Sequence, residues 1–394
     1  MGWLTRRQRG VRGICRTVAC SSLLALAVML AGCGSSSSSK TTASSSAASS
    51  ASKAATTGSS GAGGIHEATS LAAKAMATPT ALYQTPLKSK PTPHTIVFMN
   101  NQTPQSANLL EGVQDGAKLA GWTFKSVNFD DSNPATLVTG MQQALQYKPF
   151  AVVVSSFPES LWKSEIPAYQ KAGVKIIALV IGPQATSATV PVNIGDFTDG
   201  GKVLADWFVS DSGAKGQALM VDLPSYPILT ESKTGALAEI SRLCPACKVS
   251  EFEGTLAEVS SSSLVPNIVT ALRKDPSIHY VLDTDLAFIE GLAEQLKAAG
   301  ITGVKIAGTQ PLPQDLAAVK AGTQSSAVVI SNLLLGWLCT DSALRLSEGM
   351  KVPPGDNGVP SVLLTSSNTK TTNLAEYGVP AGFAQQFAKL WKVG

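Results

Sequence analysis

The stretch TIVFMNNQTPQSANLLEGVQDGAKLAGW, residues 95–122, contains a short apolar run, a polar loop and a helical segment in that order. The run 95–99 consists of β-branched and apolar residues without interruption, as in a strand buried on both faces. The segment 109–120 has a helical pattern and is followed by Gly121, a typical helix stop. The stretch therefore predicts one strand–loop–helix unit of a parallel α/β sheet.

The same order of elements recurs along the chain. Further strands are expected at residues 122–129, 150–154, 174–180 and 190–194, and helices at 134–146 and 161–172. A second series has expected strands at 217–221, 248–253, 280–282 and 305–307, and helices at 200–209, 230–242, 264–273 and 288–299. Later elements are expected at 335–348 (helix), 361–364 (strand) and 383–391 (helix). Two α/β blocks of similar size predict two doubly wound lobes, with ligands at the carboxyl ends of the strands.

The first 32 residues have the layout of an export signal. Five arginines and no acidic residue precede the apolar run 22–32. This run is too short to span a membrane as a helix, which needs about 20 apolar residues. The sequence Leu30-Ala31-Gly32-Cys33 resembles the lipobox of bacterial lipoproteins, which implies cleavage before Cys33 and attachment of lipid to Cys33. The alternative is an ordinary cleaved signal in which this cysteine has no role.

Residues 33–92 are expected to form a tether between the lipid and the folded body. The part 35–64 is rich in Ser, Ala, Gly and Thr, and such a composition buries too little surface to offset the entropy of ordering. The prolines of 79–93 predict a stiffer second part. Removing the five signal arginines lowers the formal charge from +4 to −1, so the basic balance does not indicate nucleic-acid binding.

Three segments carry a resemblance to a known family: EGVQDGAKLAGW (111–122), DFTDGGKVLADWF (196–208) and AAGITGVKIAGTQ (298–310). In their order along the chain they resemble the periplasmic sugar-binding proteins of ABC importers, most closely the ribose-binding group. That group shares its fold with the ligand-binding part of LacI-type regulators. The resemblance covers residues 95–352 and implies a type I periplasmic binding protein, with two doubly wound parallel-sheet lobes joined by a three-crossing hinge.

By this resemblance the first lobe comprises residues 93–195 plus 333–352, and the second comprises 196–332 plus 353–394. Binding of a small polar ligand is expected to close the lobes, and the closed form is what the permease recognises. A monomer without cofactor or metal is implied. The export signal and the lack of a helix-turn-helix head argue against a repressor.

The resemblance places ligand contacts in the loops that follow the strands. Polar candidates are Asn101, Thr103, Gln105, Asp285, Gln310 and Asn332. Phe157 and Tyr226 are candidate aromatic contacts, although each could instead pack on its own lobe, and Asp285 could instead be a helix N-cap.

The family's charged groups are changed here. Residues 181–183 replace an Asp-Arg pair, and an arginine is missing near Ser232, although Lys233 lies beside it. The loss of these groups, which make strong charge-assisted bonds, predicts a small neutral polar ligand.

Three cysteines lie outside the signal and the lipobox: Cys244, Cys247 and Cys339. Cys244 and Cys247 are expected to form a disulfide in an exported protein. A thioredoxin-like redox pair is the alternative, and a zinc site would need two further ligands. Cys339 lies in an apolar helical segment and is expected to be a buried free thiol.

Enzyme motifs are lacking: the sequence has no phosphate-binding loop with a lysine, no histidine pair at helical spacing and no GxSxG. The expected function is a lipid-anchored solute-binding protein of a carbohydrate ABC importer, on the extracytoplasmic face of the cell membrane. The alternative is a tethered receptor that passes ligand occupancy to a membrane sensor kinase. A surface protein whose cleft is no longer used is a third possibility.

Overall fold

The computed structural model describes residues 60–82, 85–133, 135–352, 359–369, 373–374 and 377–394. The predicted signal, residues 1–32, and Cys33 lie outside this part of the chain, as does most of the predicted tether. Within the described residues, no helix has the length and apolar composition needed to cross a membrane.

The first sheet has five parallel strands in the order β2-β1-β3-β4-β5. The strands are β1 (Thr95–Asn100), β2 (Thr123–Asn128), β3 (Ala151–Ser155), β4 (Lys175–Leu179) and β5 (Val192–Ile194). The helices between them are α2 (Pro104–Ala120), α3 (Thr136–Leu145) and α4 (Ile166–Ala172), with 3-10 turns η1 (Glu159–Leu161) and η2 (Lys163–Glu165). The stretch 95–122 thus folds as the predicted strand–loop–helix unit.

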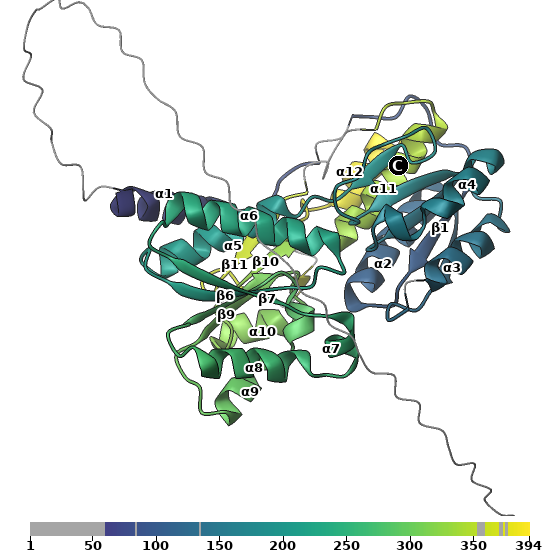
Figure 1. The fold of residues 1–394 in the computed structure, drawn as a ribbon. Coiled ribbons are helices and arrows are strands. Elements are labelled where there is room, and N and C mark those ends of the chain that lie inside the picture. Colours follow the sequence, from purple (N-terminus) through teal and green to yellow (C-terminus); the bar gives the residue numbers. More distant parts are fainter. Residues whose placement is uncertain (1–59, 83–84, 134, 353–358, 370–372, 375–376) are drawn as a thin grey trace, which may run out of the picture. The chain divides into compact units, whose positions relative to one another are not determined.

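The second sheet has six strands in the order β11-β10-β9-β8-β6-β7, and only β11 runs antiparallel to its neighbour. The strands are β6 (Gln217–Asp222), β7 (Lys248–Glu253), β8 (Tyr280–Asp283), β9 (Lys305–Thr309), β10 (Ser326–Ile330) and β11 (Ser361–Leu364). The helices are α5 (Thr198–Asp211), α6 (Pro227–Leu243), α7 (Leu256–Ser260), α8 (Leu264–Lys274), α9 (Leu292–Ala298) and α10 (Pro313–Ala321), with the 3-10 turn η3 (Leu286–Ile289). Helices α5 and α6 cover one face of this sheet, and α8, α9 and α10 the other (Figure 1).

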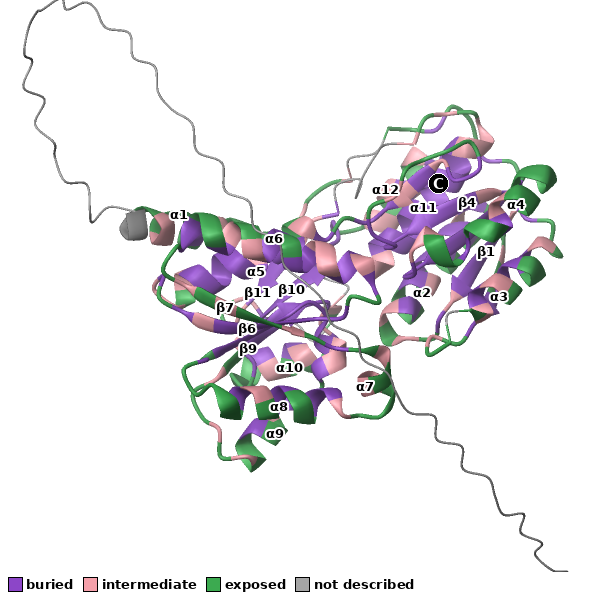
Figure 2. Cartoon of the chain, in the orientation of Figure 1, coloured by how far each residue is buried: buried purple, intermediate pink, exposed green. Residues whose placement is uncertain are grey.

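The central strands are buried, as the uninterrupted apolar runs predict (Figure 2). Every predicted strand is present, with its ends shifted by at most two residues. The two parallel-dominated sheets with their helices confirm the predicted fold class, a type I periplasmic binding protein.

Helix α11 (Asn332–Ser347) follows β10 of the second sheet but packs against α2 of the first. Glycines permit this close approach: a Cβ on Gly112 would lie 2.2 Å from the Leu333 carbonyl oxygen, and one on Gly336 would lie 2.3 Å from that of Leu109. The chain then returns to the second sheet as β11. We call the first sheet with α2, α3, α4 and α11 the first lobe, and the second sheet with α5 to α10 the second lobe.

The C-terminal helix α12 (Phe383–Leu390) differs from expectation, since the sequence resemblance places residues 353–394 in the second lobe. Strand β11 does pair there, but α12 packs on α11 of the first lobe. Trp337 stacks on the rings of Phe387 and Trp391, and the Trp391 indole donates to Asp341 over 2.8 Å. Burial of these large rings against Trp337 is the physical reason for the placement.

Helix α1 (Ser60–Ala75) also differs from expectation, because it lies within the predicted tether 33–92. It packs against α5 and α6 and buries Ala68 and Ala72. Glu67 forms an ion pair with Arg242 at 2.8 Å. The small side chains spaced four residues apart give the helix a narrow packing stripe. Because the segment is rich in Ser and Ala, this stripe produces no clear apolar pattern in the sequence.

Other differences are local. Helix α2 begins five residues earlier than predicted, since Thr103 is its N-cap and Pro104 opens its first turn. The helix predicted over 288–299 is interrupted at Gly291, which has a φ of 81°. The helix predicted over 161–172 begins as 3-10 turns before α4. The sequence pattern does not predict α7, α10 or β10.

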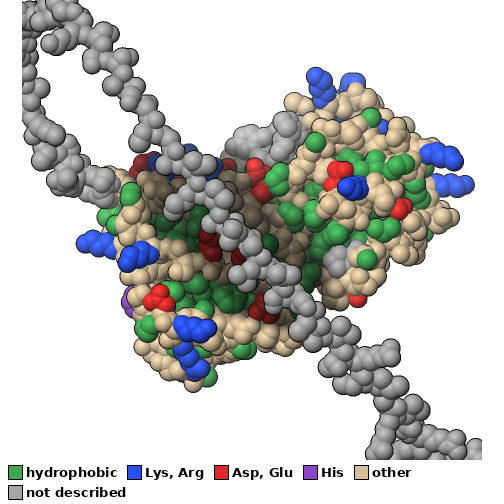
Figure 3. All heavy atoms as spheres, viewed as in Figure 1, with side chains coloured by type: hydrophobic (Ala, Val, Ile, Leu, Met, Phe, Trp, Pro, Cys, Tyr) green, Lys and Arg blue, Asp and Glu red, His purple; other side chains and the backbone are tan. Residues whose placement is uncertain are grey.

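A disulfide joins Cys244 to Cys247 after the end of α6. Cys339 on α11 is a buried free thiol, and burial raises its pKa. On the face drawn in Figure 3, the Lys and Arg side chains of the described residues are scattered rather than gathered in one patch. That face does not present the continuous basic surface typical of nucleic-acid binders.

Candidate ligand-binding cleft

A cavity lies between the two lobes at the carboxyl ends of the strands. Its lining comes from the segments after β1, β3, β4 and β5 of the first lobe and after β6, β8, β9 and β10 of the second. The lining residues are Asn101, Thr103, Gln105, Ser106, Leu109, Ser156, Val180, Phe197, Tyr226, Ile228, Leu229, Asp285, Phe288, Gln310 and Asn332. This is the position at which open parallel sheets bind ligands.

Seven of the eight residues predicted as ligand contacts line this one cavity: Asn101, Thr103, Gln105, Tyr226, Asp285, Gln310 and Asn332. Phe157, the eighth, does not line it. Its ring lies 5.3 Å from that of Tyr226 and 6.0 Å from that of Phe129, so it supports Tyr226 from behind. Tyr226 in turn stacks on Phe288 of the same lobe at 5.6 Å. These rings form a continuous apolar wall that links the lobes.

Sequence reasoning missed several lining residues, among them Ser156, Val180, Phe197 and Phe288. Ser156 and Val180 have φ values of 74° and 48°, which turn the chain directly after β3 and β4. A positive φ at a residue other than glycine has no signal in the sequence. Phe288 had a usable signal, since it closely follows Asp285 in the loop after β8.

Hydrogen bonds between side chains join the lobes at the cavity. Gln105 Nε2 donates to Asp285 Oδ1 over 2.8 Å, and the Tyr226 hydroxyl donates to Asp131 over 2.5 Å. Asp131 also accepts from Asn101 Nδ2 over 2.7 Å. Burial raises the pKa of Asp131, against the lowering effect of the bonds from Tyr226 and Asn101.

Asp285 has both roles that the sequence left open, because it lines the cavity and caps the turn η3. Its Oδ1 accepts from the Ala287 backbone N–H over 3.1 Å. Asp285 is only 6% exposed, and this burial raises its pKa well above the usual range. Asp283, two residues earlier, is fully buried, and no side chain among the described residues donates a hydrogen bond to its carboxyl group. Burial, followed by repulsion from Asp285, raises the pKa of Asp283.

Gln310, directly after β9, and Asn332, at the start of α11, each supply an amide to the cavity and form a further side-chain hydrogen bond between the lobes. Asn332 Nδ2 donates to Gln310 Oε1 over 2.7 Å. The Gln310 Nε2 group is buried without a partner in the described part of the chain, so it is a free donor. Gln310 also has a φ of 55°, a conformation unfavourable for a side chain larger than glycine and often found at functional sites.

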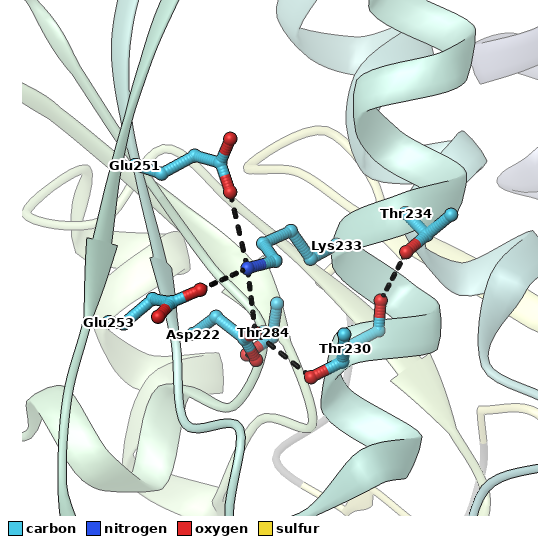
Figure 4. Close-up of polar contacts among 7 residues, drawn as sticks. All are labelled: Asp222, Thr230, Lys233, Thr234, Glu251, Glu253 and Thr284. Atoms are coloured by element: carbon cyan, nitrogen blue, oxygen red, sulfur yellow. Dashed lines mark hydrogen bonds and ion pairs between the residues drawn. The ribbon is translucent and has the colours of Figure 1, made fainter. Parts of the chain in front are cut away.

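Lys233 does not replace the missing arginine near Ser232. Figure 4 shows its amino group surrounded by three carboxylates, Asp222 at 3.1 Å, Glu251 at 3.2 Å and Glu253 at 3.0 Å. Burial lowers the pKa of Lys233, but the hydrogen bonds to the three carboxylates raise it by more. Thr230 donates to Asp222 as well, over 3.0 Å. Lys233 therefore belongs to a cluster within the second lobe and does not line the cavity.

The segment 181–183, which replaces a charged pair, lies against the second lobe. A Cβ on Gly182 would lie 2.6 Å from Cβ of Pro227, so only a glycine permits this approach. The lining residues leave a cavity of about 50 Å³, far below the roughly 300–1,000 Å³ of small-molecule sites. Entry of a ligand therefore requires the lobes to separate or the lining side chains to move.

No group of three His, Cys, Asp or Glu side chains in the described residues is placed to hold a metal ion. The cavity supplies amides, hydroxyls, one carboxylate and aromatic rings. Such a lining binds a small polar molecule by hydrogen bonds and ring contacts.

A family model of the periplasmic binding protein domain matches residues 96–351. The chain belongs to the periplasmic binding protein family. This match confirms the family suggested by the sequence resemblance and covers β1 to α11, the part that builds the cavity. No curated protein matches the sequence of this family member.

Solved structures with the same fold include three binding proteins of transporters. One is an ABC transporter solute-binding protein from Agrobacterium vitis with bound allitol: 19% identity, TM-score 0.62, covering 70% of this chain and 97% of that one. A carbohydrate transporter solute-binding protein from Agrobacterium radiobacter, in complex with D-arabinose, has 21% identity and a TM-score of 0.61. The match covers 72% of this chain and 98% of that one. A 5-methylthioribose transporter solute-binding protein from Thermotoga lettingae has 17% identity and a TM-score of 0.62. The match covers 74% of this chain and 92% of that one. At these identities the likeness establishes the fold.

Proposed function

We propose that this protein is the solute-binding component of a sugar ABC importer, which binds a small polar, sugar-like ligand between its lobes and closes around it. The observation that carries the proposal is the convergence of hydrogen-bonding side chains from both lobes on one cavity. A ligand that bonds to Asn101 on one lobe and Gln310 on the other stabilises the closed state over the open one. The sugars bound by the structural neighbours support the same ligand class.

We further propose that Cys33 carries the lipid that anchors the protein on the extracytoplasmic face of the cell membrane. The apolar run, the Leu30-Ala31-Gly32-Cys33 sequence and the serine-rich segment that follows support this proposal. Cells grown with a labelled fatty acid should incorporate the label into the wild-type protein but not into Cys33→Ser. Cys20→Ser is the matched control, because the same processing removes Cys20, and this variant should keep the label.

Thermal unfolding of the full chain against a panel of pentoses, hexoses, polyols, amino acids and nucleosides tests the binding proposal. A ligand that binds only the folded form, at a hundredfold above its dissociation constant, adds about 2.7 kcal/mol to the free energy of unfolding. One clear shift in Tm identifies the ligand class. If only amino acids or nucleosides in the same panel shift Tm, the sugar assignment is wrong.

Import is tested separately, by uptake of that labelled ligand into cells. Deletion of the gene should abolish high-affinity uptake, and the wild-type gene should restore it. Unchanged uptake in the deletion strain would contradict a role as the importer's binding component.

A further inference from the structure

The charge of the cavity is unbalanced. Its lining includes Asp285 and no Lys, Arg or His. Asp131 lies directly behind two lining residues, bonded to Tyr226 and Asn101. The fully buried Asp283 lies two residues from Asp285. Three carboxyl groups thus surround a site whose walls contain no cation.

The partners of these carboxyl groups are neutral. Asp285 accepts from the Gln105 amide and a backbone N–H, and Asp131 accepts from a phenol and an amide. The carboxyl group of Asp283 faces the neutral backbone N–H groups of Thr284 and Asp285, which lower its pKa against the stronger effect of burial. In none of the three cases does a lysine or arginine form an ion pair within the described part of the chain.

Lys233 does not correct this balance, although it lies on α6, which contributes Ile228 and Leu229 to the cavity. Its single positive charge is shared by Asp222, Glu251 and Glu253. The cluster in Figure 4 is therefore itself negative in sum. It adds to the negative potential of the second lobe.

A buried carboxylate without a counter-charge is costly, and the cost falls when a cation arrives. An ammonium group brings a positive charge and three hydrogen-bond donors. Its bonds to carboxylates are roughly twice as strong as neutral ones. An anionic ligand, by contrast, finds no Lys, Arg or His in the cavity lining.

We propose that the ligand carries a protonated amine, as an amino sugar does, and that Asp285 is the counter-ion of this amine. The proposal rests on the sugar-binding function proposed above and names the substrate class of that site. It replaces the neutral ligand expected from the sequence, because the arginines are missing while the carboxylates remain. The free Nε2 donor of Gln310 is then available to donate a hydrogen bond to a hydroxyl or ring oxygen of the same ligand.

The test compares matched ligands on the wild-type full chain by titration calorimetry. Each series consists of an amino sugar, its N-acetyl derivative and the parent sugar: glucosamine, galactosamine and mannosamine with their neutral partners. We expect one amine to bind at least tenfold more tightly than both neutral members of its series. Neutral members that bind as tightly or more tightly overturn the inference and leave the proposed function standing. No binding in any series overturns the inference, and the thermal-unfolding panel then decides the proposed function separately.

Asp285→Asn provides the second measurement. Asparagine keeps an oxygen acceptor and is a good N-cap, so the turn η3 is retained. The variant should weaken binding of the amine at least tenfold more than it weakens binding of the N-acetyl sugar. Equal loss for both ligands would overturn the role of Asp285 as counter-ion. If this variant does not fold, the wild-type comparison still decides the inference.

Discussion

Gln105 at the start of α2 donates a hydrogen bond to Asp285 at the start of η3, over 2.8 Å, and so joins the first lobe to the second at the cavity. Both side chains line the site, so each occupies a position that a ligand would contact. A ligand that binds Asp285 therefore displaces the Gln105 amide, and the exchange of one bond for another keeps the cost of opening low.

Substitution Gln105→Ala should shift the ligand-free protein toward the open form, because one of the side-chain hydrogen bonds between the lobes is removed. Small-angle X-ray scattering should show a larger radius of gyration than in the wild type. A saturating ligand should bring the two values together. Gln143→Ala, on the exposed side of α3, is the matched control. An unchanged radius in Gln105→Ala would show that this bond does not hold the lobes.

The buried pair Arg345–Asp341 on α11 ties distant segments of the chain together. Arg345 is fully buried, bonds to Asp341 at 2.6 Å and donates to the Thr85 carbonyl oxygen over 2.6 Å. Arg345→Met leaves the carboxylate of Asp341 buried without its cation and should lower the free energy of unfolding by about 3–5 kcal/mol. Urea denaturation measures this loss.

The double variant Asp341→Leu/Arg345→Met serves as the control for that prediction. It removes both charges, so it should lose less stability than Arg345→Met alone. A double variant that is less stable than the single one would show that the hydrogen bonds, and not the unpaired charge, dominate.

The Cys244–Cys247 disulfide closes a loop of only four residues. Loop-closure entropy for such a loop is worth about 2 kcal/mol, compared with about 4.7 kcal/mol for a loop of 100 residues. The variant Cys244→Ser/Cys247→Ser should therefore still fold, with a modest loss measured by denaturant unfolding, and wild type under reducing conditions should match it. Failure of the variant to fold would show that the disulfide contributes more to stability than loop-closure entropy predicts.

Asp206 on α5 predicts a pH dependence of stability. Burial and then repulsion from Glu239 raise its pKa from 3.8 to about 7. Because the folded state holds the proton more tightly than the unfolded state, stability falls as the pH rises from about 4 to about 7. Asp206→Asn should remove this loss of stability. At pH 8 it should raise Tm by roughly 2–4 °C, which corresponds to a gain of about 1 kcal/mol in the free energy of unfolding. Asp199→Asn, an exposed change on the same helix, should leave the pH profile unchanged.

The sheets and most of the cavity could be predicted from the sequence because both depend on local patterns. Apolar runs define the buried strands, and the residues directly after them, such as Asn101 and Gln310, must lie at the same edge of the sheet. The placement of α1 and α12 could not be predicted in this way. It depends on packing between segments far apart in the chain, as when Trp391 reaches Asp341. The ion pairs of Lys233 likewise depend on the register of β6 and β7.

The central claim is that a polar ligand binds in the cavity between the lobes. Titration calorimetry of the tightest sugar ligand against wild type, Gln310→Ala and Gln143→Ala tests it most directly. The account predicts that Gln310→Ala weakens binding at least tenfold, or about 1.4 kcal/mol, and that Gln143→Ala binds like the wild type. Equal affinity in all three proteins would contradict the assignment of this cavity as the binding site.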